Sequence, residues 1–136
     1  MDGDTMTDLL ALVERCENAM GPNRELGDEI LLACGWYLET IHAEDDGVAV
    51  SKMFWVSPSG VRSHERLDPT ASINAALTLI PEGWTAWELR SRAALTHFAA
   101  ELSRLDGRGN ENHVHGYGAT PALTFSAAAL RARAAK

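Results

Sequence analysis

The chain has 136 residues, of which 46% are hydrophobic and 23% charged, and its formal net charge is −7. This length and balance predict one folded domain, residues 1–136, and exclude wholesale disorder. The apolar runs fall short of the roughly 20 residues that span a bilayer, and the acidic balance excludes non-specific binding to nucleic-acid phosphates.

Two amphipathic helices are expected at the start of the chain. Apolar residues recur at helical spacing over residues 6–20. Asn23 is a suitable N-cap for a second helix, which Gly35 ends. The pair predicts an N-terminal helical hairpin, and the apolar stripes of its helices contain Cys16 and Cys34 as free, buried residues.

Acidic side chains concentrate in this first part of the chain. Residues 1–46 hold twelve Asp and Glu against two Arg, a balance of −10, whereas residues 47–136 hold seven acids against ten Lys and Arg, a balance of +3. Acids of this kind coat helices for solubility, or they form a surface that docks on a basic protein. The second interpretation predicts that the docking residues are Glu14, Glu17, Asp28 and Glu29. The acidic N-terminus is also unlike a signal peptide, so a cytoplasmic location is expected.

Three strands are expected next. Segments 36–42 and 47–56 have branched and aromatic residues typical of strands, and the turn-forming segment 43–47 joins them. A second turn at 57–60 predicts that residues 61–65 pair back against the second strand.

A helix over residues 70–80 is expected after these strands. Asp68, Thr70 or Ser72 is suited to cap it, and Pro81 ends it. Residues 84–90 then predict a strand, whose alternate side chains lie on opposite faces. Trp84, Ala86 and Glu88 are expected on one face, and Thr85, Trp87 and Leu89 on the other.

The last third of the chain gives less uniform signals. Residues 93–105 fit a helix by their period and their propensities. Residues 107–118 contain four glycines in twelve residues, which is typical of a flexible polar loop. Thr120 caps a final, alanine-rich helix that has Pro121 at its first position.

The stretches "RELGDEILLACGWY", "TASINAALTLIPEGW" and "GATPALTFSAAALRARAA" follow one another along the chain. Together they resemble small phage and prophage proteins built on an alpha-beta-alpha sandwich domain. In those proteins a Gly-Trp pair ends an early helix, a capped helix runs into an aromatic strand, and an Ala-Thr-Pro-Ala-Leu helix closes the domain. The resemblance covers about half of the chain.

The resemblance implies an α+β fold in which helices flank an antiparallel sheet of about four to five strands. It implies that the strand after the capped helix is central, with Trp84 and Trp87 filling the two faces of the sheet. It also implies that segment 94–103 is a strand, because tertiary context overrides helical propensity. We adopt that prediction, with Thr96, Phe98, Ala100 and Leu102 facing inward.

The function that the resemblance implies is that of a phage-encoded accessory protein acting in the host cytoplasm. We expect a non-enzymatic protein that inhibits a component of host defence, in the manner of an anti-CRISPR protein. Its partner would be a basic protein, and self-association into a homo-oligomer is a further candidate. No catalytic residue and no cofactor are expected, since no group of residues meets the geometric requirements of an active site.

Two alternatives remain open. In the first, a nucleotide immune signal is sequestered, because guanidinium groups bind phosphate through paired hydrogen bonds and aromatic rings stack on bases. The residues for that site are Arg90, Arg92, Trp87, Tyr117 and Arg108.

The second alternative is a metal-dependent hydrolase built on His113 and His115. A His-x-His pair supplies two ligands from one extended segment, whereas zinc requires three or four. Glu111, His97 and His64 are candidate third ligands, but no spacing selects one of them. We therefore assign no metal to the chain.

Overall fold

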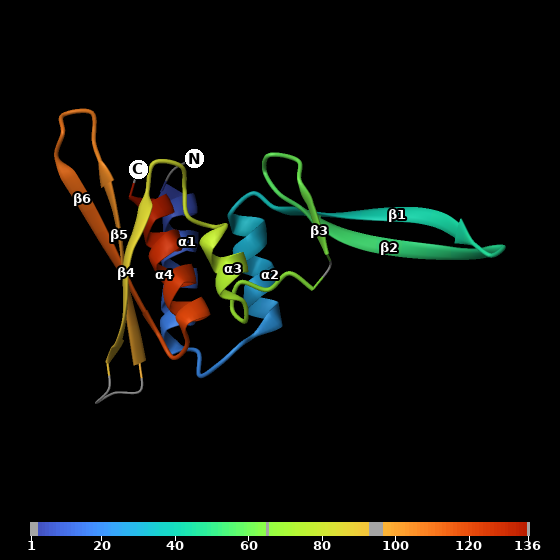
Figure 1. Ribbon diagram of the computed structural model, residues 1–136, viewed down its shortest axis with the longest axis horizontal. Coiled ribbons are helices and arrows are strands. Elements are labelled where there is room, and N and C mark those ends of the chain that lie inside the picture. Colours follow the sequence, from blue (N-terminus) through green and yellow to red (C-terminus); the bar gives the residue numbers. More distant parts are fainter. Residues whose placement is uncertain (1–2, 65, 93–96, 136) are drawn as a thin grey trace.

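The computed structural model describes residues 3–64, 66–92 and 97–135, and for residues 3–5, 45, 87 and 92 it describes the backbone alone. The helices lie between two antiparallel sheets (Figure 1). In chain order the elements are α1 (Gly3–Asn18), α2 (Arg24–Ala33), β1 (Tyr37–Asp45), β2 (Val48–Val56), β3 (Arg62–His64), α3 (Ile73–Leu77), β4 (Thr85–Arg92), β5 (His97–Leu105), β6 (Glu111–Gly118) and α4 (Pro121–Ala134).

The predicted α+β class, with antiparallel strands, flanking helices and an N-terminal pair of helices, is confirmed. The strands are divided between two sheets of three, in the orders β1-β2-β3 and β4-β5-β6, rather than gathered in one sheet. The predicted strand after residue 93 is also confirmed, since β5 begins at His97. Thr96 lies outside the described residues. The expectation that the preceding strand is central was wrong, because β5 is the central strand of its sheet and β4 lies at the edge.

Local capping signals place the helix starts. The side chains of Asn23, Ser72 and Thr120 each accept a hydrogen bond from the backbone N–H three residues further along, at 3.0, 3.2 and 3.2 Å. Of the three candidate caps for the middle helix, Ser72 is therefore the one used. Thr70 instead holds the loop against the start of α2, since its hydroxyl donates to Asp68 Oδ1 at 2.7 Å and accepts from Asn23 N at 2.9 Å.

Helix α4 lies at the centre of the molecule, and every residue from 122 to 130 is buried. It packs against β5 and β6 on one side and against α1 and α3 on others. Two glycines let β6 approach it closely: a Cβ atom added at Gly116 would lie 2.4 Å from the backbone nitrogen of Ala128. No helix in the described part of the chain is long and apolar enough to cross a membrane.

The two cysteines are free and buried, as predicted. Burial raises the pKa of the Cys16 thiol to about 12 and that of Cys34 to about 11. Both thiols therefore stay protonated and serve as packing groups.

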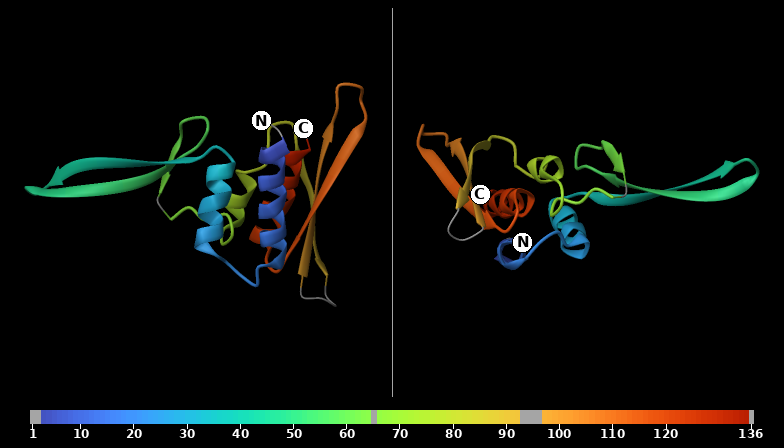
Figure 2. Two further views of the ribbon diagram at one scale, coloured as in Figure 1. Left: turned by 180° about the vertical axis from the view of Figure 1, so that it is seen from behind. Right: turned by 60° about the horizontal axis from the view of Figure 1, so that its bottom comes forward.

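Residues 37–56 form a long hairpin, which we call the arm. β1 and β2 pair over nine residues each, from Tyr37 opposite Val56 to Asp45 opposite Val48. β3 pairs only with the last three residues of β2, from Phe54 to Val56. The rest of the arm is thus a two-stranded ribbon, and it projects away from the helices (Figures 1 and 2).

Two local predictions in the second sheet were wrong. Ala86 pairs with Leu102 whereas Glu88 pairs with Glu101, so a bulge between them puts Ala86 and Glu88 on opposite faces instead of one. The expected polar loop at 107–118 is largely strand, because β6 occupies Glu111–Gly118. Gly116 and Gly118 serve close contact with α4, whereas Gly107 and Gly109 lie in the turn before β6.

Candidate functional site

The face of the β4–β5–β6 sheet that points away from α4 carries most of the predicted ligand residues. Cross-strand register assigns them to that face, since paired residues point to the same side of a sheet. We call this surface the outer face. The register places on it Thr85, Glu88, Arg90, His97, Ala99, Glu101, Ser103, Leu105, Glu111, His113, His115 and Tyr117.

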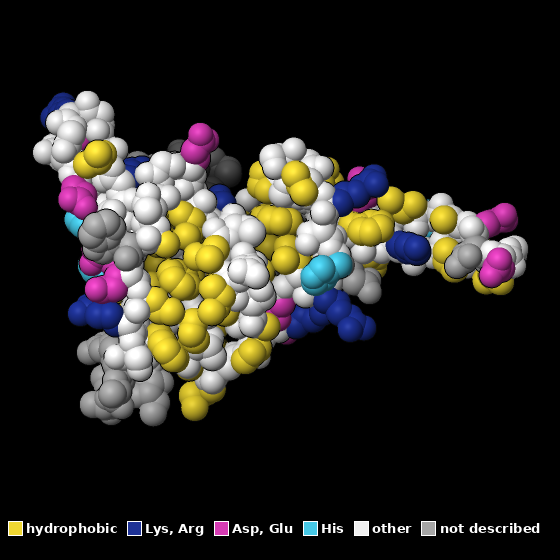
Figure 3. Space-filling model, viewed as in Figure 1, with side chains coloured by type: hydrophobic (Ala, Val, Ile, Leu, Met, Phe, Trp, Pro, Cys, Tyr) yellow, Lys and Arg dark blue, Asp and Glu magenta, His cyan; other side chains and the backbone are white. Residues whose placement is uncertain are grey.

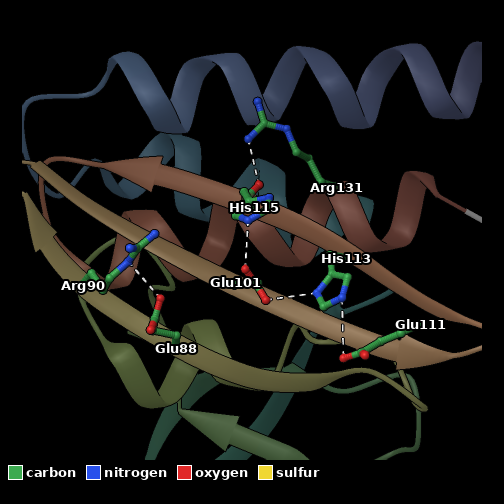
Figure 4. A network of polar contacts seen from close by, with 7 residues as sticks. All are labelled: Glu88, Arg90, Glu101, Glu111, His113, His115 and Arg131. Atoms are coloured by element: carbon green, nitrogen blue, oxygen red, sulfur yellow. Dashed lines mark hydrogen bonds and ion pairs between the residues drawn. The ribbon is translucent and has the colours of Figure 1, made fainter.

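A single carboxylate holds both histidines of the His-x-His pair (Figure 4). Glu101 Oε2 lies 3.0 Å from His113 Nδ1, and Glu101 Oε1 lies 3.0 Å from His115 Nε2. The other ring nitrogen of His113 lies 3.5 Å from Glu111 Oε1. The side chain of Glu101 is 22% exposed, against 40% and 45% for the two histidines. Both rings are therefore oriented by the carboxylate between them.

The other candidate metal ligands are spread over the molecule. His64 lies on β3 in the other sheet, and His97 begins β5, four residues before Glu101. Glu111 is the only one of the three that reaches His113. Within the residues that the structure describes, no group of three His, Cys, Asp or Glu is placed to hold a metal ion.

The structure brings together some of the residues predicted to bind a nucleotide. Arg90 and Tyr117 both pair with Ala99, so the three form one row across the outer face. Arg90 Nε lies 2.8 Å from Glu88 Oε1 and is thus already paired with a carboxylate. Of the remaining ligand residues, Arg108 lies in the β5–β6 turn, and the side chains of Trp87 and Arg92 lie outside the described part of the structure.

The charge of the outer face opposes a phosphate ligand. Three carboxylates, those of Glu88, Glu101 and Glu111, share the face with the guanidinium of Arg90. A cluster of acids repels an anion and lowers its local concentration. The row of Arg90, Ala99 and Tyr117 is therefore a weak site for a nucleotide.

The acidic residues of the N-terminal helices lie on another side of the molecule. α1 and α2 run side by side and face the viewer in the rear view of Figure 2. Residues 3–33 contain seven Asp and Glu against two Arg, a balance of −5. A shallow groove between the two helices is lined in part by Glu14, Arg15, Asn23 and Leu26. We call this surface the α1–α2 face.

Two of the four predicted docking residues, Glu14 and Glu29, are exposed, and a third, Asp28, is partly buried. Glu14 is exposed beside the groove. Glu29 Oε2 lies 2.7 Å from Arg15 Nη1, and both side chains are nearly half exposed. Burial and the neighbouring Asp68 raise the pKa of Asp28, and Arg24 opposes the shift. Asp28 is thus a carboxyl group whose charged form is disfavoured in the folded chain.

The fourth predicted docking residue, Glu17, forms contacts within the chain. Its carboxylate accepts hydrogen bonds from both terminal nitrogens of Arg131, one of them at 2.9 Å, and from the backbone N–H of Tyr117 at 3.2 Å. Arg131 also donates to the carbonyl of His115 at 2.8 Å. Glu17 therefore fixes α1 to α4 and β6, and its charge is compensated within the chain.

Reasoning from the sequence missed one surface, the exposed face of the arm. Val48, Val50 and Phe54 share one side of β2 with Lys52, whereas Ala49, Ser51 and Met53 lie on the other side. This alternation is the signal that predicts an amphipathic strand. It does not say whether the chain itself covers the apolar side. None of the described helices does so over most of the arm (Figure 1).

Comparison of the chain with protein-family models, with curated proteins and with solved structures finds no match. Its function is therefore inferred from these surfaces.

Proposed function

We propose that the chain is a non-catalytic protein that inhibits a component of host defence by docking its α1–α2 face on a basic protein partner. The observation that carries the proposal is the exposed excess of acid on two adjacent helices, with a groove between them. Helices that are packed on a core offer a rigid surface, so little ordering is required when a partner binds.

The accessible charge supports this assignment. Glu14 and Glu25 are exposed, and no ion pair is described for either of them within the described residues. Unpaired surface acids attract a basic partner over a Debye length of about 8 Å at physiological salt and accelerate its association. The groove beside Glu14 can receive a side chain of the partner.

The contribution of each charge can be bounded. An exposed ion pair contributes about 0.5 kcal/mol, so the loss of three pairs costs about 1.5 kcal/mol, or roughly tenfold in affinity. Reversing the charges costs more, because attraction becomes repulsion. Glu17 belongs to the internal contact with Arg131 and is not counted in the docking surface.

The test is a phage plating assay in bacteria that carry one defined defence system at a time. The wild-type chain is expected to restore plaque formation against at least one system. The variant E14K/D28K/E29K is expected to lower that restoration at least tenfold. The control E44K/E82K/E111K makes the same change in charge at exposed sites elsewhere and is expected to retain activity. Full activity of the first variant would refute docking through the α1–α2 face.

Sequestration of a nucleotide signal has weaker support. Among the described side chains, the row of Arg90, Ala99 and Tyr117 favours it, and the neighbouring carboxylates oppose it. Loss of anti-defence activity in R90A, with the E14K/D28K/E29K variant fully active, would reverse this preference.

A further inference from the structure

Along most of its length, the arm has an apolar face that no described helix or further strand covers. At its base the guanidinium of Arg62 lies over the ring of Phe54, 5.9 Å from the ring centroid. In the β1–β2 register, alternate residues of the two strands point to the same side. Tyr37 and Val48, at the two ends of this side, are 50% and 61% exposed. A hairpin of two strands is marginally stable in water unless further strands or other groups pack on it. Glu39 and Lys52 also lie on this side. The apolar residues of this side are Tyr37, Ile41, Ala43, Val48, Val50 and Phe54.

A second apolar surface lies between β4 and α3 (Figure 3), and we call it the β4–α3 hollow. Leu89 pairs with Ala100, a buried core residue, so Leu89 points to the helix side of the sheet, where it is 38% exposed. On α3, Ile73 and Leu77 are 42% and 38% exposed, and their spacing of four residues puts them on one side of the helix. β4 pairs with β5 alone among the described strands, so its other edge can accept contacts.

The two apolar surfaces face the same way. Both are visible in the single view of Figure 3, with the arm at one end of the long axis and the hollow towards the other. Consider a two-fold axis in front of this face, perpendicular to the long axis and midway between the two surfaces. It places a second copy face to face with the first. The same rotation carries each arm over the hollow of the other copy. The contact is then closed and self-complementary, as is usual for dimers.

The area of exposed surface agrees with such a contact. The chain exposes 8240 Å², whereas a compact monomer of 14.7 kDa exposes about 6,900 Å². The excess is thus about 1,300 Å² for each chain. A stable interface of standard size buries about 800 Å² on each partner. This excess is larger than the area that one partner of a standard interface buries.

We infer that two copies of the chain associate by arm exchange, with the apolar face of each arm seated in the β4–α3 hollow of the other. The α1–α2 face points to the opposite side of the molecule (Figure 2). Its acids therefore stay apart and remain accessible in the dimer. The inference goes beyond the proposed function and does not depend on it.

Mass measurement by light scattering and analytical ultracentrifugation tests this inference. The wild-type chain is expected at twice its mass of 14.7 kDa. Ile41→Glu places a negative charge on the apolar side of the arm, and Leu89→Lys places a positive charge in the hollow. Each variant alone is expected to be a monomer. An equimolar mixture of the two is expected to regain the dimer, because the introduced carboxylate of one chain meets the introduced ammonium group of the other while the second contact is wild type.

The control substitution is Met53→Glu, which alters the opposite side of the arm at a residue that is 42% exposed. This variant is expected to remain a dimer. A wild-type chain that is monomeric at every concentration up to its solubility limit would overturn the inference. Dimers that survive both single substitutions would also overturn it. An equimolar mixture of the two variants that stays monomeric would overturn it as well. If the dimer formed through contact between the two arms, a substitution in the hollow could not restore it. The E14K/D28K/E29K variant is expected to stay dimeric. Failure of the dimer inference can therefore be distinguished from failure of the proposed docking surface.

Discussion

Adding one methyl group at Gly116 tests the contact on which the second sheet depends. A Cβ atom at this position would lie 2.4 Å from both Ala128 N and Thr124 O, and 2.8 Å from Ala128 Cβ. Ordinary contact begins at 3.4 Å, so β6 and α4 must separate by about 1 Å, the difference between 3.4 and 2.4. The atoms in the way belong to the helix backbone, which cannot rotate aside as a side chain can.

The magnitude of the effect follows from this geometry. Overpacking a core costs about 1–3 kcal/mol, and a clash with the backbone of a buried helix belongs at the upper end. Alanine gains about 0.5–1 kcal/mol over glycine inside a strand, which offsets part of the cost. The net expectation for Gly116→Ala is a loss of about 2 kcal/mol in the free energy of unfolding. For a chain of this length, that loss lowers Tm by about 7 °C.

Thermal and urea unfolding followed by circular dichroism measure both quantities. Gly107→Ala is the matched control, because a Cβ atom at Gly107 meets no atom within 4 Å. Its expected change is within about 0.5 kcal/mol. If Gly116→Ala were as stable as Gly107→Ala, then β6 and α4 would not be in direct backbone contact. The explanation of the glycines in β6 would then be refuted.

Three further substitutions test the acidic residues. Glu17→Gln is expected to lower the free energy of unfolding by about 2 kcal/mol, between the effects of breaking exposed and buried ion pairs, because Arg131 is only 32% exposed. Glu29→Gln breaks an exposed ion pair and is expected to lower the free energy of unfolding by less than about 0.5 kcal/mol. If urea unfolding gave the same loss for Glu17→Gln as for Glu29→Gln, Glu17 would be an ordinary surface charge. Asp28→Asn is expected to stabilise the chain near neutral pH, because the folded-state pKa of Asp28 is raised above its ordinary value of 3.8. The ionised carboxyl group destabilises the fold increasingly as the pH rises from 3.8 through the folded-state pKa. The gain in stability from Asp28→Asn should therefore vanish as the pH falls below 3.8. An equal gain at pH 7 and pH 3 would show that it does not come from ionisation of Asp28.

The sequence predicts the parts of this fold that depend on neighbouring residues. The caps at Asn23 and Thr120 place two helix starts because a cap and the N–H group it accepts from are three residues apart. The β1–β2 hairpin follows from a turn between two branched segments. The position of β4 at a sheet edge does not follow, since strand order depends on pairings between distant segments.

The candidate site shows the same division. The acidic excess of α1 and α2 can be counted in the sequence. The removal of Glu17 from that surface cannot be predicted, because its partner Arg131 lies 114 residues away. The strand character of β6 was obscured by its glycines, which are equally typical of a loop. Their role appears only when α4 is placed against Gly116.

The two proposed surfaces lead to a prediction that neither makes alone. In the arm-exchanged dimer the α1–α2 faces point outward, so one dimer presents two copies of the docking surface. Ile41→Glu leaves the α1–α2 face intact while it separates the chains. The monomeric variant is therefore expected to bind a single partner molecule with an affinity within about threefold of wild type, because no docking residue has changed. A loss of about 10²-fold or more, measured with a partner that itself has one site, would mean that the arm touches the partner directly. With a two-fold symmetric partner, the same loss would instead report avidity, which reaches roughly 10²–10⁴ when both sites are spanned at once. Affinities measured with a one-site and a two-site form of the partner distinguish direct contact of the arm from assembly through it.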